Sequence, residues 1–257
     1  MLWLLACATP VETEETDFDA AVHLAFAHLL DAEEADAEVW ILAIEAEVDA
    51  KIDLANPDVL ARSLTPTPLT AEDLAGVTVP DRDPSLALAN AVARLSTHPR
   101  SDHLDMPLMV DQTPVEPQCP DHYVRSFLEG EDCWPECALR TSNDVTKTNL
   151  LFTVDYVLPK DFRPVVLGDG RVATLARSYT TGRNVSADGT AAIEQSESVE
   201  LWLDRPDGSG TLRLMSVWSE TVFTDMEVDD SMVIGTVALG TDAIFVRQDE
   251  WLAAGGG

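Results

Sequence analysis

The sequence predicts an α+β protein, in which N-terminal helices and a proline-rich wrapping segment pack on an antiparallel β-sheet. Apolar residues recur at helical spacing near the start of the chain, prolines crowd its middle, and apolar and polar residues alternate from about residue 149. We expect a leader and acidic tether over 1–16, a helical and proline-rich region over 17–118, and a cysteine-containing loop with a β-rich domain over 119–257.

Two helices are expected at the start of the folded region. The first is indicated by apolar residues on one helix face, Phe18, Val22, Phe26, Leu29 and Leu30. Thr16 or Asp17 can cap its start. The second carries on one side Trp40, Ile41, Ile44, Val48 and Ile52. Asn56-Pro57 ends it, and an antiparallel helix pair is the natural interpretation.

The segment 64–117 is expected to be mostly irregular chain that wraps around the fold. Its prolines are Pro66, Pro68, Pro80, Pro84, Pro99, Pro107, Pro114 and Pro117, and such a density argues against a long sheet here. One short helix is predicted within it. Asp83-Pro84-Ser85 offers a cap and a first-turn proline. The face of this helix would be formed by Leu88, Val92 and Leu95.

Strands are predicted in the second half of the chain. Alternation indicates a strand over 150–158, and Gly168-Asp169-Gly170 is a turn signal before another over 171–181. Two further apolar runs flank the turn-rich loop 204–210 and should form an antiparallel hairpin.

The register of this hairpin can also be predicted. If Leu203 pairs with Leu212, Trp202 faces Arg213 on the outer side of the sheet, where a cation–π contact would help to cover the ring.

A C-terminal helix is favoured for the last apolar segment, 232–246. Asp229-Asp230-Ser231 is a good helix start, and the spacing of the following residues fits one face, with Val233, Val237, Gly240 and Ile244 on it. The β-branched residues and two glycines also permit a pair of strands.

The charge of the chain excludes one class of partner. The sequence has 46 acids against 16 bases, a formal net charge of −30. Nucleic-acid binding depends on lysine and arginine neutralising phosphates, so we expect no nucleic-acid partner.

Leu4-Leu5-Ala6-Cys7 resembles the lipobox of bacterial lipoprotein precursors, in which the cysteine is lipidated and becomes the first residue of the mature protein. The resemblance implies a truncated signal peptide over Met1–Ala6, lipidation of Cys7, and a lipid bilayer as partner through several acyl chains. It places the protein in the bacterial cell envelope, facing the periplasm or the surface. The alternative is an apolar N-terminus that docks on the fold or frays. Outside these four residues we recognise no family.

The remaining cysteines, Cys119, Cys133 and Cys137, are disulfide candidates, because disulfides form readily outside the cytoplasm. We expect one pair among them, although the sequence cannot choose the connectivity. The alternative is a structural zinc site with His122 as the fourth ligand, because three thiolates and one imidazole suit tetrahedral zinc. Otherwise no cofactor is expected.

No nucleophile or phosphate-binding motif is present, so the leading functional hypothesis is a non-enzymatic module that binds a small apolar ligand or an envelope protein. A curved sheet closed by a helix could hold such a ligand in a pocket lined by Phe152, Tyr156, Leu201 and Trp218. One alternative is a carboxylate- or metal-dependent envelope hydrolase, which requires two acids with raised pKa values in one cleft. The other is a structural or spacer lipoprotein, which requires neither pocket nor cleft.

Overall fold

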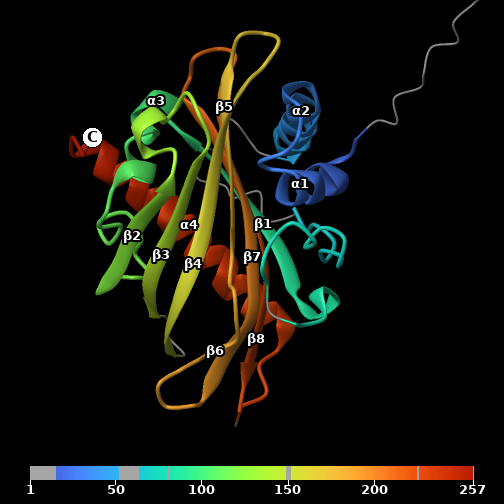
Figure 1. Cartoon of the computed structure of the whole chain (residues 1–257), viewed down its shortest axis with the longest axis vertical. Helices are drawn as coiled ribbons and strands as arrows, with labels where there is room; N and C mark the ends of the chain where they lie inside the picture. Colours follow the sequence, from blue (N-terminus) through green and yellow to red (C-terminus); the bar gives the residue numbers. More distant parts are fainter. Residues whose placement is uncertain (1–15, 52–63, 80, 149–151, 225, 257) are drawn as a thin grey trace, which may run out of the picture.

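A computed structural model describes residues 16–51, 64–79, 81–148, 152–224 and 226–256. It has the α+β fold expected from the sequence, with helices on both sides of an antiparallel sheet (Figure 1). The helices are α1 (Phe18–Ala27), α2 (Glu34–Lys51), α3 (Arg100–His103) and α4 (Asp230–Ala253), with short 3₁₀ turns at Pro84–Leu86, Met106–Leu108 and Glu131–Cys133. The strands are β1 (Leu88–Ser96), β2 (His122–Glu129), β3 (Leu139–Thr148), β4 (Thr153–Val166), β5 (Val172–Tyr179), β6 (Asn184–Val185), β7 (Ala191–Asp204) and β8 (Thr211–Phe223).

The described strands form one sheet in the order β1-β8-β7-β5-β4-β3-β2, and the short β6 pairs with β7. Every pairing is antiparallel. Apart from β6, the strands from β2 to β8 therefore lie side by side in chain order, and β1 lies at the far edge beside β8. Helix α4 crosses one face of this sheet, while α1 and α2 cover the other (Figure 1).

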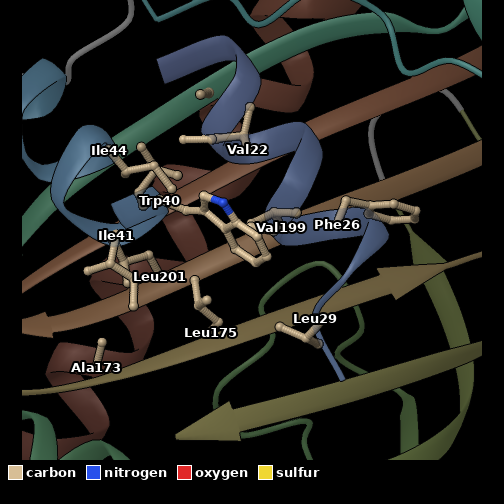
Figure 2. Packing of buried hydrophobic residues seen from close by; sticks show 14 of the residues in the cluster. Val22, Phe26, Leu29, Trp40, Ile41, Ile44, Ala173, Leu175, Val199 and Leu201 are labelled. Carbon is tan, nitrogen blue, oxygen red and sulfur yellow. The ribbon is translucent and has the colours of Figure 1, made fainter. Parts of the chain in front are cut away.

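The predicted helix pair is present and packs on the sheet. Helix α1 begins where expected, because the Ala20 N–H donates to the Asp17 side chain at 2.8 Å. The apolar faces of α1 and α2 meet the strands in one core cluster, in which Ile41 of α2 lies beside Leu201 of β7 (Figure 2). Ile52 and Asn56-Pro57 lie outside the described residues.

The prediction of a short helix after Asp83 is wrong. Asp83 does accept a hydrogen bond from the Ser85 N–H, but only a single 3₁₀ turn follows it. The chain then forms β1, which is covered on both faces of the sheet. The side chains that point to one face and those that point to the other are therefore both largely buried. Alanines at 89, 91 and 93 occupy one of these sets and obscure the two-residue period of the strand.

Strands β2 and β3 lie in the segment that the sequence predicts as a cysteine-containing loop. The inward-facing positions of β3 are largely polar, since Thr141, Asn143 and Lys147 share a face with Leu139 and Val145. An apolar alternation is therefore absent, and the strands could not be predicted from it.

The hairpin of β7 and β8 has the predicted register, because Leu203 pairs with Leu212 and Trp202 with Arg213. The prediction that Trp202 and Arg213 face outward is wrong, since both side chains are buried. The Arg213 guanidinium lies 4.3 Å from the centre of the Phe245 ring of α4, so the cation–π contact is made with this ring.

The C-terminal segment is a helix, as favoured, and the alternative pair of strands does not form. The Asp229 side chain caps α4 by accepting from the Ser231 N–H at 2.8 Å. Polar contacts to β1 hold the helix further along, where Arg94 pairs with Asp242 at 3.0 Å and the Ser96 hydroxyl donates to Asp249 at 2.8 Å. None of the described helices combines the length and apolar character needed to cross a bilayer.

Candidate ligand-binding cavity

A cavity of about 670 Å³ lies between the sheet and helix α4. Its walls come from β2 to β5, β7, β8, the segment 116–120 and the N-terminal two-thirds of α4. Pockets for one small ligand typically have volumes of about 300–1,000 Å³. The cavity is thus large enough for a ligand of drug size.

Small side chains on both walls leave this space open. The sheet presents the hydroxyl residues Ser178, Ser196, Ser198, Ser219 and Thr221. The Ser178 and Ser198 hydroxyls, on adjacent strands, hydrogen-bond to each other at 2.8 Å. The facing side of α4 contributes Val233, Thr236, Val237, Gly240 and Ile244. These short side chains leave a gap between the helix and the sheet at the cavity, whereas elsewhere along α4 Ala238 and Phe245 pack against Met215 and Val217 of β8.

Aromatic side chains form another part of the lining. Phe152 lies against Phe223, with ring centres 5.9 Å apart, and Tyr156 lines the same cavity from β4. Burial raises the pKa of the Tyr156 phenol well above its usual value, so this group stays neutral at physiological pH. These rings provide an apolar surface that can pack against a ligand.

A buried ion pair crosses the sheet floor of the cavity. Lys160 Nζ on β4 lies 2.5 Å from Glu200 Oε1 on β7, and both side chains are largely buried. The ammonium also lies 5.2 Å from the centre of the Phe162 ring. Each charge thus has a partner, which a buried charge requires.

Three more polar groups lie where the segment 116–120 meets β3. Burial raises the pKa of the Glu116 carboxyl to about 7, although the Lys160 charge opposes the rise. Burial lowers the pKa of the Lys147 ammonium, against the attraction of Cys119 and Glu116. Burial also raises the pKa of the Cys119 thiol to about 12, so it is protonated and a poor nucleophile at physiological pH.

The structure separates the four residues predicted to line one pocket. Phe152 and Tyr156 line the cavity. Leu201 and Trp218 are fully buried on the opposite face, in the core under α1 and α2, where the Trp218 indole donates to the Thr67 carbonyl at 2.7 Å. Successive strand residues point to opposite faces. The residues that reach the cavity are therefore their sequence neighbours, Glu200 and Val217.

Sequence reasoning missed the charged lining residues Glu116, Lys147, Lys160 and Glu200. One signal could have drawn attention to two of them. The chain has only three lysines, Lys51, Lys147 and Lys160, so each is a rare residue in a very acidic sequence.

The cysteines do not gather in one place. Cys133 and Cys137 form the expected single disulfide, and Cys119 is a buried free thiol in the cavity wall. His122 Nε2 lies 3.3 Å from a carboxylate oxygen of Asp144. Two of the three sulfurs considered as zinc ligands are thus bonded to each other, and no cluster of three or more metal-ligating side chains occurs in the described part of the chain. Cys7 lies outside the described residues.

Comparisons with known proteins return similarities of backbone arrangement only. No family model and no curated protein sequence matches the chain. Among solved structures, a fragment of a STAR-related lipid transfer protein from Xanthomonas axonopodis aligns with a TM-score of 0.44 and 12% identity, over 65% of this chain and 87% of that one. The protein TTHA0849 of Thermus thermophilus aligns with a TM-score of 0.41 and 14% identity, over 66% of this chain and 99% of that one. Ara h 8.0201 aligns with a TM-score of 0.38 and 15% identity, over 65% of this chain and 99% of that one. The functional argument therefore depends on the cavity itself.

Proposed function

We propose that this protein is a non-enzymatic binding module that holds one small, mainly apolar ligand between the sheet and helix α4. The cavity of about 670 Å³ is the observation that carries the proposal. Its lining joins aromatic and aliphatic side chains to hydroxyl groups and four charged groups, and small-molecule sites likewise combine an apolar surface with polar groups.

The lining does not favour the hydrolase alternative. That function requires two acids with raised pKa values in one cleft, and the acids of the described lining are Glu116 and Glu200. Glu200 is engaged by Lys160, which leaves Glu116 without a second free carboxyl beside it. A purely structural spacer does not require a cavity, so the cavity also weighs against that alternative.

We further propose that the module is attached to the bacterial cell envelope through a lipidated Cys7. The support is the lipobox-like Leu4-Leu5-Ala6-Cys7 and the Cys133–Cys137 disulfide, which is compatible with an oxidising compartment. Intact-mass analysis of natively expressed protein tests this directly. Acyl chains on an N-terminal Cys7 are expected, and an unmodified cysteine in the cytosolic fraction would rule out the attachment.

Filling the cavity tests the binding function. Val237 lines the cavity from α4, so Val237→Trp should occupy the space that the ligand needs and lower the affinity for an apolar probe such as dodecan-1-ol by at least about tenfold. Titration calorimetry measures the affinity, and urea unfolding checks that the variant is folded.

Arg247→Trp is the matched control, because Arg247 lies on the same helix with an exposed side chain outside the lining. It should bind the probe as the parent protein does. Equal binding by all three proteins would show that the probe lies elsewhere, and failure of the parent to bind any apolar probe would overturn the proposed function.

A further inference from the structure

The cavity lining differs in charge from the molecule as a whole. The sequence carries 46 acids and 16 bases, and three of the bases are lysines. Two of those three, Lys147 and Lys160, line the cavity, where the acids are Glu116 and Glu200. In the cavity lining the cations equal the acids in number, although acids outnumber bases almost threefold in the whole chain.

The three lysines differ in what neutralises them. Lys51 pairs with Glu47 on α2 at 2.7 Å, and Lys160 pairs with Glu200 at 2.5 Å. Within the described part of the chain, Lys147 forms no ion pair, and Glu116 is the carboxyl that acts on it from further away. An ammonium in a partly desolvated site is costly without a partner. A ligand anion at this position would provide that partner.

Glu116 is suited to accompany such an anion. Burial raises its pKa to about 7, so its carboxyl is mostly protonated below that pH. A protonated carboxyl is a hydrogen-bond donor, and with Glu116 neutral the lining carries a net positive charge. An anionic group would then find an ammonium and an acidic hydroxyl in the same part of the cavity. A cationic group would be repelled by Lys147, and a neutral group would leave that ammonium unpaired.

We propose that the ligand is a single-chain amphiphile with an anionic head such as a carboxylate, which binds Lys147 in the part of the cavity near Glu116 while the apolar chain lies between the sheet and α4. This inference rests on the proposed function, since it specifies the ligand of the same cavity. The contact is a charge-assisted hydrogen bond, the strong class of such bonds, and it sets the orientation of the ligand.

Three probes with the same twelve-carbon chain test the head-group assignment: dodecanoate, dodecan-1-ol and dodecyltrimethylammonium, titrated calorimetrically into the full chain at pH 6. The parent protein should bind dodecanoate about tenfold tighter than the alcohol, and the ammonium compound most weakly. Lys147→Gln should bind dodecanoate about tenfold more weakly and the alcohol unchanged. Lys147→Arg should retain the preference for the carboxylate. Lys51→Gln is the matched control, because it removes the lysine that lies outside the cavity, and it should leave all three affinities unchanged.

The outcomes separate this inference from the proposed function. If the alcohol or the ammonium compound binds the parent protein as tightly as dodecanoate, the assignment of an anionic head is wrong while the cavity still binds apolar ligands. If Lys147→Gln weakens all three probes equally, Lys147 supports the cavity wall and does not bind the head group. If none of the probes binds, the proposed function itself fails.

Discussion

The two faces of the sheet are made by the same strands, yet only one of them is solidly packed. Along β7, Val199, Leu201 and Leu203 point toward α1 and α2 and are fully buried in a continuous apolar core (Figure 2). Along the same strand, Ser198 and Glu200 point toward α4 and line the cavity. Over residues 198–201 of β7, the alternation of the strand thus directs Val199 and Leu201 into the core and Ser198 and Glu200 to the binding space.

The covering helices differ in the same way. The pair α1 and α2 inserts large side chains into the core, among them Phe26, Trp40 and Ile44. The part of α4 above the cavity carries small residues such as Thr236 and Gly240. We therefore expect truncations on the packed face to reduce the free energy of unfolding more than truncations on the cavity face.

Leu201→Ala tests this expectation where the effect is largest. Removing a fully buried leucine from a packed core costs about 3 kcal/mol through lost burial and a new cavity. Val217→Ala, on the cavity face of the neighbouring strand, should cost less than about 1 kcal/mol because its side chain already borders open space. Urea unfolding measures both. Similar losses for the two variants would show that the cavity face supports the fold as strongly as the packed face does.

Glu197 makes the stability of the packed face fall as the pH rises from 5 to 8. Burial, and then the nearby Glu220 charge, raise the pKa of its carboxyl to about 8, and its Oε1 has no hydrogen-bond partner among the described residues. The folded state therefore binds this proton more tightly than the unfolded state does. The stabilisation is fully present below the unfolded pKa of about 4.3 and is lost as pH rises through the folded value. We expect the free energy of unfolding to fall by about 3–4 kcal/mol between pH 5 and pH 8.

Glu197→Gln should remove most of this fall, since glutamine does not titrate. Glu131→Gln, at an exposed position, should leave the pH profile of the parent protein unchanged. Unfolding curves at several pH values make the comparison. A parallel decline in the parent protein and Glu197→Gln would assign the loss to other groups.

Removing the helix caps should give the smallest effects. Asp17→Ala deletes the cap of α1 on the packed side and should cost about 1 kcal/mol of global stability. Asp229→Ala deletes the equivalent cap of α4, and its main effect should be faster amide exchange over 230–236, above the cavity. Hydrogen exchange and urea unfolding distinguish the two responses. An equal loss of global stability would show that the start of α4 unfolds together with the core.

The sequence predicted the parts of the fold in which local pattern and tertiary packing agree. The helices α1, α2 and α4 and the Leu203–Leu212 register fall into this group, because caps, turn residues and apolar spacing all indicate the same structure. Strand β1 was missed because burial on both faces removes the contrast between its alternating positions. Strands β2 and β3 were missed because β3 presents polar residues such as Asn143 and Lys147 to the interior.

The binding face could not be chosen from the sequence for a related reason. Leu201 and Trp218 were selected as pocket residues because they are the large apolar residues of their strands. The same property places them in the solid core, where α1 and α2 bury them. The position of α4 decides which set of strand residues borders the cavity, and that position is a tertiary feature which local periodicity does not contain.

The rarity of lysine has a practical consequence for experiments in solution. Lys147 and Lys160 line the cavity and are less exposed than Lys51, which ends α2 on the other side of the sheet with a partly exposed side chain. Amine-directed dyes and crosslinkers reach Lys51 directly from solvent, whereas they reach Lys147 and Lys160 only by way of the cavity. A fluorophore conjugated there leaves the cavity unaltered.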